Sequence, residues 1–134
     1  MNVDIIVDNS ALIEVVTGAQ PHPALLRQLM LARAAAPELL DAEALSVIRR
    51  MARSRVLSTD RAKTALLQIQ QAPLLRLPHR PLLERAWELR HSISAYDALY
   101  VALAEQLDVP LVTCDAKLAS SNGHHAEIEL YPIS

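Results

Sequence analysis

Short apolar segments of strand length alternate with helix-forming segments along this chain, and that alternation restricts its fold more than any other feature. Strands separated by helices run parallel, and helices then cover both faces of their sheet. We therefore predict the α/β class, with a three-layer α/β/α sandwich around a small, mainly parallel sheet. The segments expected to be extended are Val3–Val7, Pro37–Leu40, Leu74–Leu77, Pro110–Cys114 and a final strand near Ile128–Tyr131.

Capping residues and prolines set the expected helix boundaries. Leu83 and Trp87 share one face of an expected helix, and we predict that they pack against the core. The expected helices are Ser10–Val16, a helix with Pro23 in its first turn that continues to Met30, a helix capped by Asp41, a helix capped by Ser58, Pro81–Ile93, a helix capped by Ser94 that continues to Leu107, and a short helix after Asp115.

The composition fits one domain and excludes several classes of protein. A chain of 134 residues, 51% of them hydrophobic, has the size of a single domain with one core, so we expect residues 1–134 to form one domain. Gly18 and Gly123 are too few glycines for a phosphate-cradling loop, which excludes a P-loop and a dinucleotide fingerprint. The formal net charge is −2, so any binding of nucleic acid needs a local basic patch.

The expected location is the cytoplasm. Cys114 is the only cysteine, which excludes an intrachain disulfide and a cysteine-based zinc site and suits a reducing compartment. The amino-terminal sequence MNVDIIVDNS has no basic region and only a brief apolar run, so we expect no signal peptide. The apolar segments are too short to span a bilayer, so we expect no membrane partner.

Acidic residues follow three of the expected extended segments. Asp8 directly follows DIIV, Glu43 comes shortly after ELL, and Asp115 directly follows PLVTC. In open α/β sheets, sites form beyond the carboxyl ends of the strands, so these acids are expected at one edge. Asp97 lies on the apolar helix SAYDALYVALAEQL, where its neighbours on the same face carry no charge that could pair with it. A hard cation, or the positive end of the helix, would offset the cost of burying Asp97.

Several carboxylates without thiols form a site for Mg²⁺ or Mn²⁺ rather than for zinc or copper. A water bound to such an ion can become a nucleophile, and the ion can screen the charge of a phosphate, so phosphodiester hydrolysis suits these residues best. The sequence leaves a structural interpretation of each acid open. Asp8 and Asp115 also fit helix caps, Glu43 fits an acid in a first helical turn, and Ser94 with Asp97 resembles a capping box.

Four segments, taken together and in order, resemble the signature regions of the PIN-domain family: IIVDNSALIEVV, LLDAEALSVIRR, SAYDALYVALAEQL and LVTCDAKLA. The narrower resemblance is to the VapC-type toxin ribonucleases of VapBC toxin–antitoxin systems, over nearly the whole chain. It implies a PIN-like α/β/α nuclease fold and an endoribonuclease that depends on Mg²⁺ or Mn²⁺. Asp8, Glu43 and Asp97 match the metal-binding catalytic acids, and Asp115 matches a less constant fourth acid.

The resemblance extends to residues around the acids and to partners. Ser10 and Thr113 match hydroxyl positions where they would orient carboxylates or water, although a role in capping a turn is equally open. Lys117 stands where some PIN nucleases carry a further acid, which disfavours a tightly held second metal ion. Family members usually form homodimers and are bound by a VapB-type antitoxin, which often places an arginine among the acids.

Arg49, Arg50, Arg53 and Arg55 form the densest basic cluster of the chain, on or just after the helix of Glu43. The first three are candidates to contact RNA phosphates, and an ordinary solvated helix face is the alternative. Two further functions stay open: a PIN nuclease that processes RNA without toxicity, and a catalytically idle PIN-like binding module. A receiver-type phosphotransfer domain is disfavoured. Such a domain has a lysine at the end of a late strand, whereas the late strand here ends in Thr113, Cys114 and Asp115.

Overall fold

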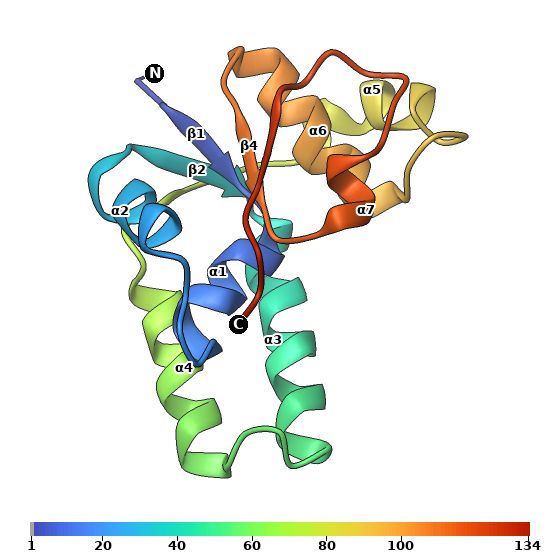
Figure 1. The fold of residues 1–134 in the computed structure, drawn as a ribbon. Helices are drawn as coiled ribbons and strands as arrows, with labels where there is room; N and C mark the ends of the chain where they lie inside the picture. The colour runs from blue at the N-terminus through green and yellow to red at the C-terminus, as the bar shows by residue number, and fades with distance from the viewer. Residues whose placement is uncertain (1) are drawn as a thin grey trace.

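In the computed structural model, which describes residues 2–134, five strands form one sheet in the order β3-β2-β1-β4-β5, and all neighbouring strands are parallel (Figure 1). This confirms the predicted α/β class. The strands are β1 (Ile5–Val7), β2 (Ala34–Pro37), β3 (Leu75–Leu77), β4 (Leu111–Thr113) and β5 (Ile128–Leu130). The helices are α1 (Asn9–Thr17), α2 (Pro23–Leu31), α3 (Leu39–Arg53), α4 (Thr59–Gln71), the 3₁₀ helix η1 (Arg80–Leu82), α5 (Leu83–Glu88), α6 (Ala95–Leu107) and α7 (Ala116–Ala119).

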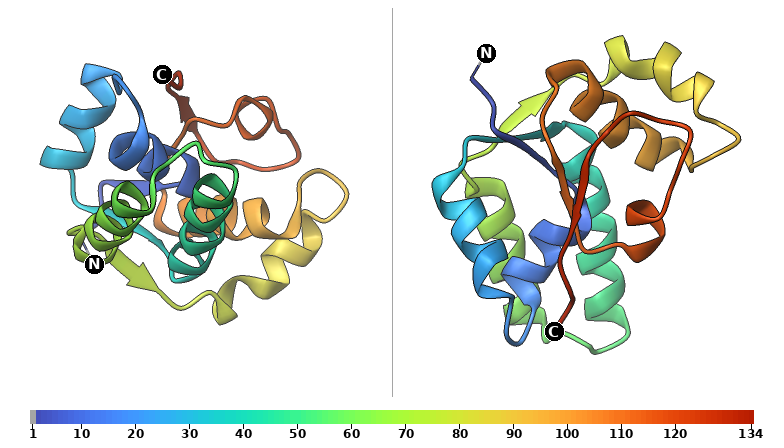
Figure 2. Two further views of the ribbon diagram at one scale, coloured as in Figure 1. Left: turned by 90° about the horizontal axis from the view of Figure 1, so that it is seen from below. Right: turned by 45° about the horizontal axis from the view of Figure 1, so that its top comes forward.

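Helices cover both faces of the sheet, as the three-layer prediction requires (Figures 1 and 2). Helix α6 packs against β1, β2 and β4, with α5 beside it, and α1 and α2 lie on the other side. Helices α3 and α4 lie side by side and extend below the sheet in Figure 1. Within residues 2–134, no helix has the length and apolar character needed to cross a membrane.

The burial of α6 explains where its polar end lies. All residues from Ala98 to Ala104 are buried, because the helix is enclosed by the sheet and by α5. The Ser94 side chain caps the helix as predicted, since its hydroxyl accepts a hydrogen bond from the N–H of Asp97. Ser58 caps α4 in the same way, through the N–H of Arg61. The first turn of α6 therefore stands at the border between the core and the solvent.

The prediction of an extended segment at Pro37–Leu40 is wrong by several residues. The strand is Ala34–Pro37, and α3 already begins at Leu39. An alanine run favours helix by local propensity, but here it is fully enclosed between β1, β3 and α6, and tertiary packing overrides propensity. Asp41 is not the cap of α3, because Glu38 occupies that position and Asp41 lies within the first turn.

The helix predicted over Pro81–Ile93 is shorter than expected. It consists of η1 followed by α5, which ends at Glu88. The prediction that Leu83 and Trp87 pack against the core is also wrong, since 55% of Leu83 and 66% of Trp87 are exposed. The guanidinium of Arg90 lies 4.2 Å from the centre of the Trp87 ring, so this ring has a cationic neighbour instead of an apolar one.

Candidate active site

Asp8 lies directly beyond β1 and is the most buried of the four predicted acids, with 5% of the residue exposed. Two hydroxyls donate to the same carboxylate oxygen: Ser10 Oγ lies 2.6 Å from Asp8 Oδ2, and Thr113 Oγ1 lies 2.8 Å from it. Burial raises the pKa of Asp8, whereas these two hydrogen bonds lower it and the charge of Asp115 raises it further. Asp8 occupies the N-cap position of α1, but its side chain makes no capping hydrogen bond.

Thr113 connects the end of β4 with the end of β1. Its hydroxyl accepts a hydrogen bond from the N–H of Asp115 at 3.0 Å while it donates to Asp8. Ser10 Oγ accepts from the N–H of Cys114 at 2.9 Å and lies 3.1 Å from Thr113 Oγ1. The two predicted hydroxyls therefore orient the Asp8 carboxylate. Asp115 also caps α7, since its Oδ1 accepts from the N–H of Lys117 at 2.9 Å, so one structural interpretation of Asp115 holds.

Glu43 comes from α3 and is held by a side chain that sequence analysis did not select. The hydroxyl of Tyr100, a fully buried residue of α6, donates to Glu43 Oε1 at 2.7 Å. Burial raises the pKa of Glu43, the hydrogen bond from Tyr100 lowers it, and the charges of Asp8 and Asp97 raise it. Tyr100 follows Asp97 by one helical turn, and that spacing is the signal that could have pointed to it.

Asp97 lies in the first turn of α6, at the helix end where the backbone N–H groups favour a negative charge. Burial is the main cause that raises the pKa of Asp97, and the charges of Asp8 and Asp115 raise it as well. Its side chain is half-buried, and its backbone N–H is the partner of the Ser94 cap. Asp97 thus combines the capping-box position with proximity to the other acids.

The charges of the acids influence the pKa values of their acidic neighbours. Within residues 2–134, none of the four acids forms an ion pair. In the same residues, no three acidic, histidine or cysteine side chains are spaced to hold a metal ion directly. Mg²⁺ usually takes only one or two carboxylates directly and keeps several waters, so oxygen ligands with unbalanced negative charge fit such an ion. The donor chemistry therefore suits a hydrated divalent cation.

The predicted RNA-contacting arginines lie along the outer part of α3. Arg49, Arg50 and Arg53 are exposed, and within residues 2–134 their guanidinium groups form no ion pair. Together with Ser46 and Ser54 they line a hollow of about 470 Å³. A neighbouring hollow of about 330 Å³ includes Ser46 and Arg50 and reaches Glu43. The basic side chains are therefore continuous with Glu43 on the surface of α3.

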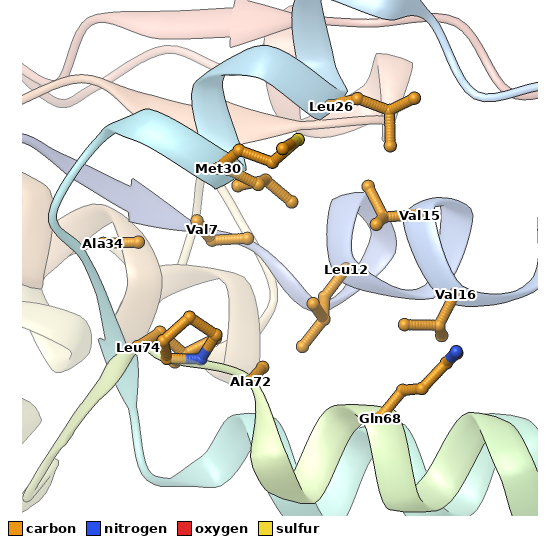
Figure 3. Close-up of a pocket in the computed structure, with 12 residues that line it drawn as sticks. Val7, Leu12, Val15, Val16, Leu26, Met30, Ala34, Gln68, Ala72 and Leu74 are labelled. Carbon is orange, nitrogen blue, oxygen red and sulfur yellow. The ribbon is translucent and has the colours of Figure 1, made fainter.

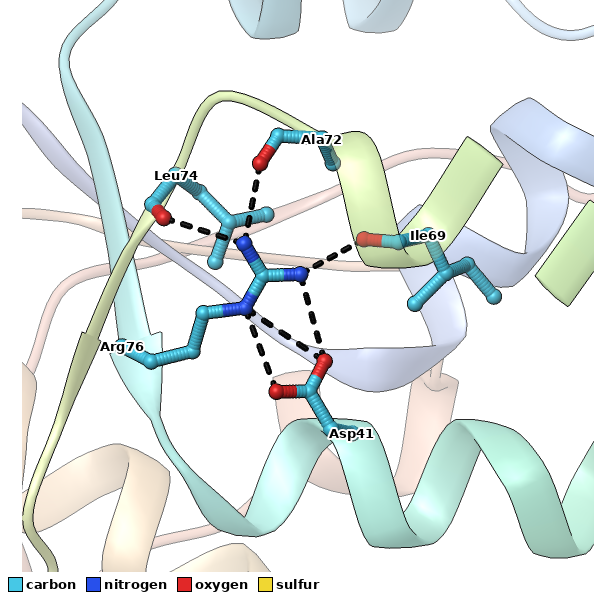
Figure 4. Close-up of polar contacts among 5 residues, drawn as sticks. All are labelled: Asp41, Ile69, Ala72, Leu74 and Arg76. Carbon is cyan, nitrogen blue, oxygen red and sulfur yellow. Dashed lines mark hydrogen bonds and ion pairs between the residues drawn. The ribbon is translucent and has the colours of Figure 1, made fainter. Parts of the chain in front are cut away.

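Arg76 connects the first turn of α3 with the end of α4 (Figure 4). Its Nε donates to the Asp41 carboxylate at 3.2 Å, and an Nη forms an ion pair with Asp41 at the same distance. The guanidinium also donates to the carbonyl oxygens of Ile69, Ala72 and Leu74, which lie at or just beyond the carboxyl end of α4. Arg76 thus fixes the turn of α3 that precedes Glu43.

A third hollow, of about 470 Å³, lies among α1, α2 and α4 and is apolar (Figure 3). Val7, Leu12, Val15 and Met30 are among its lining side chains, and Gln68 is polar. The lining contains no titratable group. None of the four predicted acids lines this hollow.

With the fold and the positions of the four acids established, the chain can be compared with known protein families. The family model described as PIN domain matches residues 5–122. This chain belongs to the PIN domain family. The matched range includes all four acids, so the site lies within the PIN domain.

Named relatives of this PIN domain cover almost the whole chain. Ribonuclease VapC1 of Mycobacterium tuberculosis is 42% identical over 127 residues, which are 93% of this chain and 96% of the relative. Ribonuclease VapC12 of the same organism is 37% identical over 126 residues, 94% of this chain and 98% of the relative.

Solved structures share the PIN fold at lower identity. PAE2754 from Pyrobaculum aerophilum has a TM-score of 0.70 at 24% identity, with 96% of this chain and 90% of that chain covered. FitAcB from Neisseria gonorrhoeae has a TM-score of 0.65 at 17% identity, with 85% and 89% covered. These structures agree with the PIN fold.

Proposed function

We propose that this PIN domain is an endoribonuclease that depends on Mg²⁺ or Mn²⁺ and is the toxin of a type II toxin–antitoxin pair. One observation carries the proposal: acids from separate elements lie close enough for their charges to raise the pKa values of Asp8, Glu43 and Asp97, and none of the four acids has an ion-pair partner within residues 2–134. Such unbalanced charge disfavours the folded chain, and a bound cation would offset the repulsion. The ribonuclease names of the VapC relatives support RNA as the substrate.

The residues divide the work as follows. Asp8, Glu43, Asp97 and Asp115 would hold a hydrated ion, one or two of them directly and the others through its bound waters, and the hydroxyls of Ser10 and Thr113 keep the Asp8 carboxylate oriented. A bound Mg²⁺ or Mn²⁺ would supply an activated water and a positive charge beside the scissile phosphate.

The arginines of α3 would supply the positive charge that RNA binding requires. The acids repel the phosphates of RNA, so binding needs nearby cations. Arg49, Arg50 and Arg53 are exposed, form no ion pair in the described part of the chain, and line hollows that lead to Glu43. We assign them to the RNA phosphates.

Partners and organisation follow from the same assignment. A toxin of this type requires an antitoxin, so a VapB-type protein is the expected partner, and the VapC relatives support it. A homodimer and a cytoplasmic location stay predictions from the sequence. One core made by a single five-stranded sheet within residues 2–134 supports treating the chain as one domain.

Comparison of the wild type with Asp97→Asn tests this function. Expression of the wild type is expected to arrest growth, and the purified protein to cut RNA only with Mg²⁺ or Mn²⁺. The amide removes one negative charge with little change in shape, so the variant should lose both effects by at least about 100-fold. Trp87→Ala is the matched control, since this exposed ring lies outside the acid site and should leave both unchanged. Cleavage by Asp97→Asn at the wild-type rate would exclude the proposed mechanism, and cleavage without growth arrest would favour RNA processing.

A further inference from the structure

The hollow beside Glu43 is lined by side chains of several chemical kinds. Glu43, Ser46 and Arg50 lie on one face of α3, at intervals of three and four residues. Tyr96 lines the same hollow from the first turn of α6. The hollow thus offers an acid, a hydroxyl, a guanidinium and an aromatic ring, which are the groups that proteins use to bind nucleotides in single strands.

The position of Tyr96 follows from that of Tyr100. The two tyrosines are four residues apart, so both project from the same face of α6, toward α3. Tyr100 is fully buried and donates to Glu43, whereas 59% of Tyr96 is exposed. Tyr96 therefore lies at the solvent-exposed end of the α6 face on which Tyr100 contacts Glu43.

The exposure of Tyr96 has no explanation within the fold. A tyrosine that serves only packing is usually buried with its hydroxyl paired. Within residues 2–134, the Tyr96 hydroxyl makes no side-chain hydrogen bond, and its ring has no cation above it, unlike Trp87. The free ring is available to a ligand.

The spacing along α3 suits a strand of RNA. Positions 43 and 50 are two helical turns apart, or about 10 Å along the helix axis, which is the scale of a few nucleotides. A phosphate near Glu43 would be the scissile one, and Arg50 can hold a phosphate further along the strand. A base between these phosphates would lie over the hollow that Tyr96 lines.

We propose that the hollow lined by Glu43, Ser46, Arg50 and Tyr96 is a subsite for one unpaired RNA nucleotide next to the cleaved bond, with its base stacked on Tyr96. This inference rests on the proposed ribonuclease function and adds to it one residue that would position the substrate. A base that stacks on the ring has to be free of its complementary strand, so the enzyme selects single-stranded segments or loops. Stacking tolerates any base, so Tyr96 selects for an unpaired strand more than for a sequence.

A cycle that combines Tyr96→Ala with an abasic RNA tests the subsite. The probe is a synthetic single-stranded RNA that the wild type cuts with Mn²⁺, together with copies that carry one abasic ribonucleotide at each position near the cut. Tyr96→Ala is expected to lower kcat/KM on the intact RNA by about 10-fold or more. Tyr96→Phe keeps the ring and is expected to retain most of the efficiency. Trp87→Ala removes an exposed ring elsewhere and should have no effect.

The cycle distinguishes stacking from an indirect effect. One abasic position should lower kcat/KM of the wild type by a similar factor and cause little further loss in Tyr96→Ala, because both changes remove the same contact. Anisotropy of the labelled RNA in EDTA should show the same pattern in affinity. Losses that multiply at every abasic position, or a Tyr96→Ala variant within twofold of the wild type, would overturn the subsite. A change in self-association alone would assign the ring to a protein interface and also overturn it.

The same experiment separates this inference from the proposed function. A wild type that cuts no RNA with Mn²⁺ removes the ribonuclease proposal, and the subsite with it. A wild type that cuts RNA, beside an inactive Asp97→Asn and a fully active Tyr96→Ala, leaves the ribonuclease in place and removes only the subsite.

Discussion

Tyr100→Phe is the substitution that most directly tests how the acid site is held. It removes one hydroxyl and keeps the ring in the core, where Tyr100 is fully buried. The lost interaction is the hydrogen bond of 2.7 Å to Glu43 Oε1. A hydrogen bond to a charged group contributes about 1.5–3 kcal/mol, and the lower part of that range applies because Glu43 is half-buried and water can replace the donor. Without the hydroxyl, the carboxylate is free to rotate away from its position.

The expected result is Mn²⁺ binding that is weaker by about 10-fold, since about 1.4 kcal/mol corresponds to a factor of ten. The measurement is a calorimetric titration of the purified protein with Mn²⁺. The hydrogen bond from Tyr100 lowers the pKa of Glu43, so its loss raises that pKa and protons compete more strongly with the metal. The deficit of the variant should therefore grow as the pH is lowered.

Tyr131→Phe is the matched control for Tyr100→Phe. The Tyr131 hydroxyl donates to Gln28 at 3.3 Å, and that contact does not involve the four acids. Its removal should leave Mn²⁺ affinity unchanged. If Tyr100→Phe bound Mn²⁺ within twofold of the wild type while keeping its fold by circular dichroism, the positioning role of the hydroxyl would be refuted.

Two further predictions concern stability. Burial raises the pKa of Asp97, so the folded chain holds its proton more tightly than the unfolded chain, and Asp97 lowers stability at pH values above the raised pKa. Asp97→Asn should thus raise the free energy of unfolding of the metal-free protein at pH 7 by no more than about 1 kcal/mol, because solvent screens the half-exposed carboxylate, and the gain should shrink as the pH falls through the raised pKa toward the ordinary value of 3.8. Urea unfolding in chelator at several pH values measures this, and a variant no more stable than the wild type at pH 7 contradicts it. Arg76→Met should lower the free energy of unfolding by about 1–3 kcal/mol, because it leaves the carbonyls at the end of α4 and the Asp41 carboxylate without their donor. Asp41→Asn should cost less than about 1 kcal/mol, since the Asp41 side chain is 49% exposed, and equal losses in the two variants would mean that the carbonyl contacts contribute nothing.

The acids could be found from the sequence because their positions follow from topology. Asp8 comes directly after β1 and Asp115 lies two residues beyond β4, and the carboxyl ends of parallel strands lie at one edge of a sheet. Asp97 could be identified as a candidate because burying a charged residue on an apolar helix costs free energy unless a partner offsets the charge. That these side chains form the active site stays a prediction until the variants are measured.

Other features could not be predicted because tertiary contacts decide them. The alanines of β2 favour helix by themselves and are extended only because β1, β3 and α6 enclose them. The spacing of Tyr100 from Asp97 places both residues on one helix face, but only the packing of α3 shows that the Tyr100 hydroxyl donates to Glu43. The pairing of Arg76 with Asp41 joins residues that are 35 positions apart, and charge patterns at that separation carry no signal.

The contact between Asp8 and Thr113 joins residues that are 105 positions apart in the chain. A chain still being synthesised possesses the first acid long before it possesses β4, and until β4 pairs with β1 the Asp8 carboxylate has neither its threonine donor nor the neighbouring Asp115. Partial chains, whether nascent or truncated before residue 111, would carry acids without a site. Under the proposed function, the chain would gain its RNA-cleaving activity only at the end of its own synthesis.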